Sequence, residues 1–217
     1  MRALSATVGP LTTAGGNAIA LAQTPAGAGS LTLNGALVTG GVAVLDTARR
    51  VAVTTAANET GRTFTITGTS SNGKVQSETI TGANAGTTYT ALDYKTVTSV
   101  TISGVASGAI TVGTNTVASS RWLRLDEWAH AQVGLQCDVT GSVVYKVQQT
   151  LDDPNDLTNP VSPAAVNWVD HPDALLVNAT TTKQGNYGYV PLYVKVTLLS
   201  GTGSVTLTAV QAGSVAL

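Results

Sequence analysis

Apolar and polar residues alternate along most of this chain with a period of two. Val51 and Val53 share one parity, as do Phe64 and Ile66 further along, and threonines fill many of the positions between. Strict alternation is typical of a β-strand with one buried face, and the branched Cβ of threonine suits the pleated surface of a sheet. Only residues 121–132 are compatible with a short helical turn. The pattern therefore predicts an all-β fold.

The second half of the chain repeats this alternation in four longer runs. Apolar residues share one parity within residues 133–139, 143–147, 194–198 and 205–209. A short turn containing glycine separates the first run from the second and the third from the fourth, which is typical of β-hairpins. We therefore expect two long hairpins, over residues 133–147 and 194–209.

The composition of the chain changes near residues 117–120, and its 217 residues are enough for two β-domains. We predict two β-sandwich or jelly-roll-like domains preceded by an extended N-terminal arm. The arm covers residues 1–30, the first domain residues 31–118 and the second domain residues 119–217. A long loop, residues 152–188, lies within the second domain.

The predicted arm contains mostly glycine, alanine and threonine and shows neither a strand period nor a helix period. A segment of this kind cannot by itself bury enough apolar surface to offset the entropy lost on ordering. We therefore expect a neighbouring subunit to hold it. The apolar side chains available as assembly anchors are Leu4, Val8, Leu11, Ile19 and Leu21.

Only 11% of the residues are charged, the net charge is −1, and the charges are scattered singly. A nucleic-acid-binding surface needs a basic patch along the phosphate backbone, so we expect no nucleic-acid partner. No stretch approaches the roughly 20 apolar residues of a membrane helix, and the N-terminus lacks the apolar region of a signal peptide. We therefore expect no membrane partner and synthesis in a cytoplasm.

Two residues are candidates for catalytic chemistry. His171 lies between Asp170 and Asp173, and a neighbouring carboxylate can orient a histidine as a general base. The alternative, a loop histidine with ordinary hydrogen bonds, is favoured because no nucleophile motif accompanies it. The single cysteine, Cys137, shares its parity with apolar neighbours, which predicts a buried and inert thiol. We therefore expect neither an enzyme nor a cofactor.

An acidic segment follows the second of the four alternating runs, residues 143–147. Asp152, Asp153, Asn155 and Asp156 offer the oxygen ligands that Ca²⁺ prefers. The spacing does not match the helix-flanked calcium loop, and Asp and Asn beside proline are also common turn formers. We favour the turn and expect no metal site.

Aromatic residues are concentrated in the second half of the chain. They are consistent with a sugar-stacking face, in which Tyr193 would take part, and equally with a protein interface, where such residues are enriched. The candidate interface aromatics are Trp122, Trp128, Trp168, Tyr187 and Tyr189.

Several strand and turn segments are similar to those of a known group of proteins. They are AQTPAGAGSLTLNGALVTGGVAVLDTARRVAVTTA, TFTITGT, ETITGANAGT, YKTVTSV, SVVYKVQQTLDDPN and GTGSVTLTAVQAG. Together they cover most of the chain, and the chain resembles virion structural proteins of tailed bacteriophages. Proteins of this kind are associated with particles as capsid decoration (cement) proteins or as neck and tail components.

The resemblance implies a non-enzymatic virion protein without catalytic residues. We expect first a capsid decoration protein that binds the major capsid protein, located in the virion and homo-oligomeric. A neck or tail component that contacts other virion proteins is the alternative, and a carbohydrate-binding β-sandwich module is a third reading.

Overall fold

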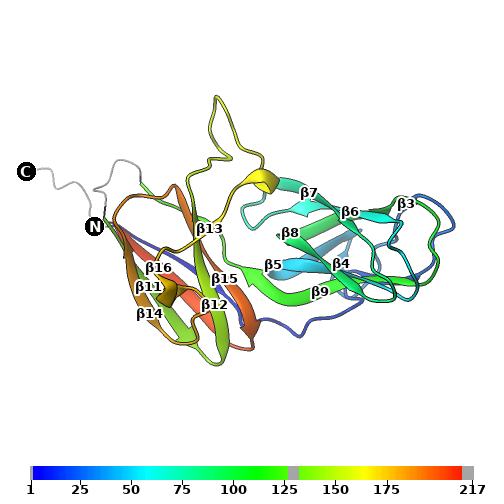
Figure 1. The fold of residues 1–217 in the computed structure, drawn as a ribbon, viewed down its shortest axis with the longest axis horizontal. Coiled ribbons are helices and arrows are strands. Elements are labelled where there is room, and N and C mark those ends of the chain that lie inside the picture. Colours follow the sequence, from blue (N-terminus) through cyan, green and yellow to red (C-terminus); the bar gives the residue numbers. More distant parts are fainter. Residues whose placement is uncertain (1, 127–131, 212–217) are drawn as a thin grey trace, which may run out of the picture. The chain divides into compact units, whose positions relative to one another are not determined.

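The computed structural model describes residues 2–126 and 132–211 (Figure 1). The all-β prediction is confirmed, because 55% of the chain is strand and 3% is helix. The chain divides into two compact units. Unit 1 comprises Met1–Leu11 and Val117–Leu217, and unit 2 comprises Thr12–Thr116.

Unit 1 contains two antiparallel sheets and two short 3-10 helices. Its first sheet has the strand order β1-β16-β11-β14, and in its second sheet β12 lies between β13 and β15 while β10 also pairs with β15. The elements are β1 (Arg2–Val8), β10 (Leu123–Arg124), β11 (Val133–Thr140), β12 (Val143–Thr150), η1 (Pro163–Ala165), β13 (Val169–Asp170), η2 (Ala174–Leu176), β14 (Lys183–Tyr187), β15 (Tyr193–Gly201) and β16 (Ser204–Gln211).

The two sheets of unit 1 enclose one apolar core, as in a sandwich. Within the first sheet, Cys137 of β11 lies opposite Leu207 of β16, and within the second sheet, Tyr145 of β12 lies opposite Leu198 of β15. All four side chains are fully buried in the same cluster. The alternation in sequence thus places one face of each strand in the core.

The two predicted hairpins are wrong, although the inward faces of their strands are right. β11 pairs with β14 and β16, and β12 pairs with β13 and β15. Consecutive strands therefore belong to opposite sheets. The turns that carry the chain across pack on each other, because the backbone N–H groups of Thr202 and Gly203 both donate to the carbonyl of Ser142. A Cβ on Gly203 would overlap the carbonyl of Thr140.

Unit 2 consists of one antiparallel sheet with short strands added along it. The main order is β9-β5-β8-β6-β7, with β2 on β9, β3 on β8 and β4 on β5. The strands are β2 (Ala20–Gln23), β3 (Gly29–Ser30), β4 (Val38–Thr39), β5 (Val42–Thr55), β6 (Thr63–Thr69), β7 (Val75–Thr81), β8 (Thr87–Ile102) and β9 (Ile110–Ser119). β9 begins in unit 2, and its last two residues pair with β15 in unit 1.

The core of unit 2 is formed by the residues whose alternation predicts inward faces. Val51 and Val53 of β5 and Phe64 and Ile66 of β6 are fully buried in one cluster. The outward positions of β6 are threonines whose hydroxyls bond across the sheet, as between Thr65 and its neighbour on β7 at 2.8 Å. These cross-strand pairs keep the outer surface polar without charge.

The prediction of a separate N-terminal arm is wrong for the residues that the structure describes. Residues 2–8 form β1, which pairs antiparallel with β16 of the same chain. Of the proposed anchors in unit 1, Val8 is fully buried, and Leu4 and Leu11 pack partly buried against the unit's own core. Pairing of β1 with β16, which is far away in the sequence, buries apolar side chains of this segment, and the composition of the segment does not predict that pairing.

The rest of the predicted arm belongs to unit 2. Ile19 is fully buried in the core of that unit, whereas Leu21 is 45% exposed. The segment lies against β9 so closely that a Cβ on Gly113 would overlap the carbonyl of Gly15. Glycine at position 113 therefore allows the backbone around Gly15 to approach β9 closely.

A buried arginine, Arg49, forms a hydrogen bond with Thr12 at the beginning of the N-terminal segment of unit 2. Arg49 of β5 is 1% exposed and forms an ion pair with Asp46 at 3.1 Å. Its guanidinium also donates to the carbonyl of Thr12 at 2.9 Å and to the carbonyl of Asn115 at 3.0 Å. Burial acts to raise the pKa of Asp46, but hydrogen bonds from Thr12 outweigh it and hold that pKa below its usual value.

Among the described residues, no helix has the length and apolar character needed to cross a bilayer.

Candidate functional site

The outward face of β15 is covered by aromatic side chains. Tyr193 and Lys195 alternate with core residues of this strand, yet both are buried. The ammonium of Lys195 lies 4.3 Å from the ring centroid of Trp168, and the ring of Trp122 packs edge-on against Trp168 with centroids 4.9 Å apart. A cation is attracted to the negative face of an aromatic ring. Both tryptophans are half-buried, so their rings serve in large part to cover the sheet of unit 1.

Carboxylates hold the turns of the segment that follows β12, residues 151–162. Asp153 accepts a hydrogen bond from the backbone N–H of Asn155 at 2.7 Å and from the hydroxyl of Tyr193 at 3.1 Å. It also pairs with Arg124 at 3.3 Å. Asp153 therefore connects this loop to the aromatic cover on β15. Figure 1 shows the segment projecting from the strands of its unit.

The two other carboxylates of the segment also accept backbone hydrogen bonds. Asp156 accepts from Asn159 at 2.8 Å and from Thr158 at 2.7 Å, and these hydrogen bonds lower the pKa of Asp156. Asp152 accepts from the backbone N–H of Asn167 at 2.6 Å. The oxygens thus serve as turn acceptors. In the described part of the chain, no group of three or more His, Cys, Asp or Glu side chains is placed to hold a metal ion.

A polar cluster lies where β13 and β14, the terminal strands of the two sheets, come together. We call Gln149, His171, Tyr187 and Tyr189 the edge cluster. The ring centroids of His171 and Tyr187 are 4.5 Å apart, and those of Tyr187 and Tyr189 are 5.7 Å apart. The amide of Gln149 donates to the hydroxyl of Tyr189. The edge cluster therefore links the two sheets of unit 1 through polar side chains.

Hydrogen bonding assigns the protonation of His171. Its Nδ1 accepts the backbone N–H of Asp173 at 3.0 Å, so the ring proton of the neutral form is on Nε2. Burial lowers the pKa of His171, and the carboxylate of Asp173 opposes this only in part. The ring is therefore neutral at pH 7, with a buried N–H donor on Nε2.

Three buried atoms of the edge cluster have no hydrogen-bond partner among the described residues. They are Nε2 of His171, the hydroxyl of Tyr187 and Oε1 of Gln149. A buried polar group without a partner costs about 1–3 kcal/mol. Each of these groups needs a partner from outside the protein chain, such as an ordered water or a ligand group. Burial also raises the pKa of Tyr187, so its hydroxyl remains a donor.

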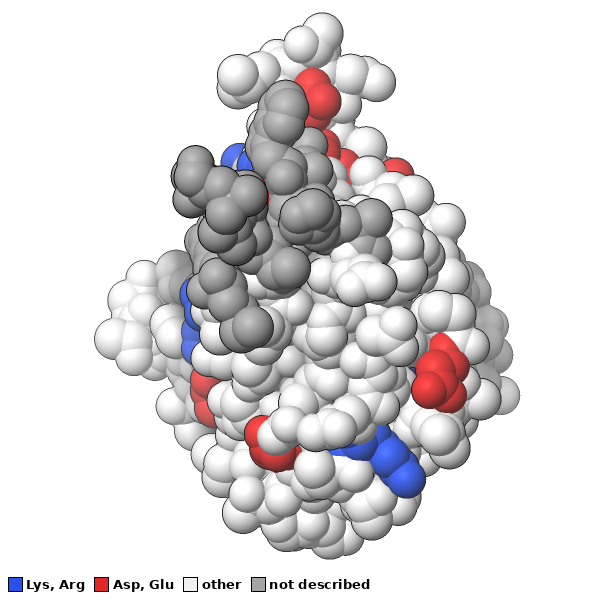
Figure 2. Space-filling view, turned by 90° about the vertical axis from the view of Figure 1, so that its left-hand side faces the viewer, with Lys and Arg blue, Asp and Glu red and all other residues white. Residues whose placement is uncertain are grey.

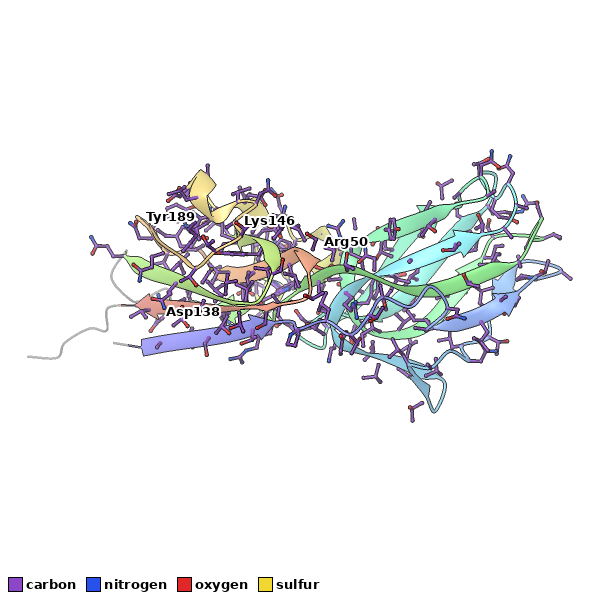
Figure 3. The ribbon with its side chains drawn as sticks, turned by 90° about the horizontal axis from the view of Figure 1, so that it is seen from below. Arg50, Asp138, Lys146 and Tyr189 are labelled. Carbon is purple, nitrogen blue, oxygen red and sulfur yellow. The ribbon has the colours of Figure 1, made fainter. Side chains whose placement is uncertain are left out.

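Two cavities open beside the edge cluster. The edge cavity, about 290 Å³, is lined by Gln149, Thr150, Leu151, Asp152, Asn167, Val169 and Tyr189. The acidic cavity, about 450 Å³, is lined by Leu151, Asp152, Asp153, Asp156, Asn159, Val161, Val190 and Leu192. The cavities share Leu151 and Asp152 and are therefore adjacent. Tyr189 lies on the same side of unit 1 as Lys146 of β12, whereas Asp138 of β11 lies on the other side (Figure 3).

Exposed apolar side chains are concentrated in the same part of unit 1. Of the ten strongly exposed large apolar residues in the described part of the chain, five lie between residues 151 and 189. They are Leu151, Leu157, Val169, Leu175 and Tyr189. We call this set the exposed connection. Leu157, in the projecting loop, is fully exposed.

The structure separates the predicted interface aromatics into different environments. Trp122 and Trp168 are half-buried, Tyr187 is buried, and Tyr189 is 43% exposed. Trp128 lies outside the described residues. Among the four that are described, Tyr189 is thus the ring most available to a partner.

Gln149 is part of the site but was not predicted from the sequence. The signal was present, because residue 149 continues the inward parity of Val143, Tyr145 and Val147 on β12. A polar side chain at an inward position must find a partner or face a cavity.

The two catalytic candidates are not brought together as a nucleophile and base. Cys137 is buried as predicted, and burial raises the pKa of its thiol to about 12, so it is protonated at pH 7. His171 is 3% exposed, its backbone N–H donates to Val147, and its Nδ1 accepts from Asp173. Both side chains are therefore held inside unit 1, away from solvent.

Comparison with known proteins does not extend this description. No protein-family model matches the chain, and no curated protein matches it.

Proposed function

We propose that this protein is a non-enzymatic structural component of a bacteriophage particle, specifically a capsid decoration protein that binds the major capsid protein. Support comes from the all-β architecture and from the resemblance of the strand and turn segments to tailed-phage virion proteins. In this proposal unit 1, whose two sheets enclose one core, serves as a sandwich domain, an architecture found in capsid proteins. The protein acts as a homo-oligomer on the virion.

The observation that carries the proposal is the exposed connection of unit 1. Five large apolar side chains are exposed within residues 151–189, and Leu157 is fully exposed in a projecting loop. Fully burying a leucine contributes about 1.5–3 kcal/mol. A protein surface that receives this loop therefore gains stability from a side chain that unit 1 leaves in water. The exposed connection replaces the N-terminal arm as the proposed attachment device.

The sparse charge of the surface is consistent with dense packing of copies on a particle. On the face shown in Figure 2, charged side chains stand singly among uncharged residues. The net charge of the chain is −1. Neighbouring copies with so little net charge repel each other weakly, so many of them can lie side by side.

The environments of His171 and Cys137 support the non-enzymatic part of the proposal. Both side chains are buried, and the thiol of Cys137 is protonated at pH 7. A nucleophile in this state lacks the activation that covalent catalysis requires. The proposal therefore assigns no catalytic residue.

Copy number in the particle tests the proposal. Particles released from cells that carry the gene are purified, and the chain is quantified by mass spectrometry against the major capsid protein. A decoration protein is present in on the order of hundreds of copies, whereas a neck or tail ring contains about six or twelve. A small closed-ring number assigns the protein to the neck or tail instead, and its absence from particles refutes a virion role.

A pair of variants tests the attachment surface. Leu157→Ser and the control Val75→Ser, which changes an exposed residue of β7 in unit 2, are supplied in place of the wild-type chain. We expect Leu157→Ser to lower the occupancy of particles and Val75→Ser to leave it unchanged. Full occupancy with Leu157→Ser means that the projecting loop is not the attachment device.

A further inference from the structure

The edge cavity has the size and the polar groups of a small-ligand site. Its volume of about 290 Å³ is close to the lower end of the range for ligand pockets, about 300–1,000 Å³. The acidic cavity adds about 450 Å³ directly beside it. The two share Leu151 and Asp152 in their linings and therefore lie side by side.

Donors and acceptors for uncharged polar groups meet in the edge cavity. Gln149 is 8% exposed, and its Oε1 is itself buried without a partner in the described part of the chain, so this residue acts on the cavity through its amide, which orients the hydroxyl of Tyr189. The hydroxyl of Tyr189 accepts from the amide of Gln149, which leaves its own proton free to donate. Asn167 supplies a side-chain amide at the rim, and Asp152 supplies a carboxylate. Such a set matches ligand hydroxyl groups, which both donate and accept.

The charges of the two cavities select against acidic ligands. The charged groups that line them are the carboxylates of Asp152, Asp153 and Asp156, and no described lining residue is Lys or Arg. The nearby guanidinium of Arg124 is paired with Asp153. An anionic ligand would therefore meet repulsion without a compensating cation.

The cavity also offers an apolar surface for one side of a ligand. The ring of Tyr189 is 43% exposed and lines the edge cavity together with Val169, which is half-exposed. An aromatic ring with this exposure can stack against a face of C–H groups while its hydroxyl remains hydrogen-bonded. A ligand with many hydroxyl groups and one C–H face is a saccharide.

We propose that the edge cavity and the acidic cavity of unit 1 together bind a neutral oligosaccharide, with one sugar ring stacked on Tyr189 and hydrogen-bonded to Asn167. This site differs from the half-buried tryptophan pair, whose rings cover β15. It is independent of the proposed virion role, because it is built from residues of one unit and requires no particle.

A glycan array with purified protein tests the proposal. The array carries neutral oligosaccharides, sialylated and uronic-acid oligosaccharides, and a basic oligolysine peptide as a probe for simple attraction to the carboxylates. The wild-type protein is expected to bind a subset of the neutral glycans only. Binding to acidic glycans only, to oligolysine only, or to no probe overturns the proposal.

Matched variants locate the binding. Tyr189→Ala and Asn167→Ala change exposed residues of the edge cavity, so both proteins are expected to fold, as far-UV circular dichroism will check. The control Tyr89→Ala removes a tyrosine of β8 in unit 2 that is 51% exposed. Tyr189→Ala should weaken neutral-glycan binding at least about tenfold, and Tyr89→Ala should not change it. Equal binding by the wild-type protein, Tyr189→Ala and Asn167→Ala means that the glycan binds elsewhere and overturns the assignment.

Discussion

Replacement of Ile19 by alanine tests whether the N-terminal segment is part of the fold or a free arm. Ile19 is fully buried in the core of unit 2. Its backbone N–H donates to the carbonyl of Val112 at 2.9 Å, and its carbonyl accepts from Gly35 at 3.0 Å. Leu21, two residues later, is 45% exposed and provides a matched control.

The expected cost follows from this burial. Replacing a buried isoleucine by alanine costs about 2–5 kcal/mol, because apolar contacts are lost and a cavity remains. The backbone of Ile19 is held on both sides, so the site cannot collapse freely, and we expect about 3–4 kcal/mol. For a domain of about 100 residues, this lowers the melting temperature by at least about 12 °C. Leu21→Ala should change the free energy of unfolding by no more than about 0.5 kcal/mol.

The measurement is urea unfolding followed by far-UV circular dichroism, with hydrogen exchange to locate the loss of stability. The shift of the urea midpoint, multiplied by the slope of unfolding free energy against urea, gives the difference in stability between variants, and hydrogen exchange resolves that difference by segment. Faster exchange is expected in the strands around Ile19 in unit 2, with β16 of unit 1 serving as a reference. A free arm makes the opposite prediction, since truncating its anchors would leave the stability of the fold unchanged. If Ile19→Ala unfolds within about 0.5 kcal/mol of the wild type, the packing argument for this segment is wrong.

Two further substitutions test buried polar and sulfur groups. Asp46→Asn should destabilise unit 2 by about 2–3 kcal/mol at pH 7, because the buried guanidinium of Arg49 loses its counter-ion. The cost stays at this level because Asp46 is partly exposed, so solvent already weakens the ion pair. Since the folded pKa of Asp46 is lowered, this difference should be complete above the unfolded pKa of about 3.9 and vanish as the pH falls through the folded pKa. Urea unfolding from pH 7 to pH 3 measures it, and a difference that does not change with pH contradicts the assignment. Cys137→Ser should cost about 1–3 kcal/mol by placing a hydroxyl in an apolar site, and the native thiol should react with a maleimide only after unfolding; rapid labelling of the folded protein would show that the thiol is accessible.

The strand faces could be predicted from the sequence because alternation is a local property. Val51, Val53, Phe64 and Ile66 have the inward positions that their parity predicts, and so does Cys137. Strand partners could not be predicted in the same way. The apolar face of β11 shows that it borders a core, but an identical face would suit either sheet of the sandwich. Its pairing with β16, far along the chain, is a matter of tertiary packing.

The position of the N-terminal segment depended on residues far away in the sequence. A low-periodicity segment that is rich in glycine and alanine is indistinguishable, on composition, from an arm held by a partner. What fixes it here is the absence of a side chain at Gly113 and the reach of Arg49 to Thr12. Neither feature has a local signature, because both depend on which backbone lies opposite.

The sequence by itself determined the all-β class, the inward faces of the strands and the sparse charge, since each depends on residue type and short spacing alone. Tertiary structure decided the site. Gln149 lies near the end of β12, His171 directly follows β13, and Tyr189 follows β14. They meet through folding at one edge of unit 1, where Gln149 and Tyr189 line the same cavity and His171 packs against Tyr187, whose ring also packs against Tyr189. Only folding brings them within hydrogen-bonding and ring-packing distance, so no spacing along the chain could have revealed them together.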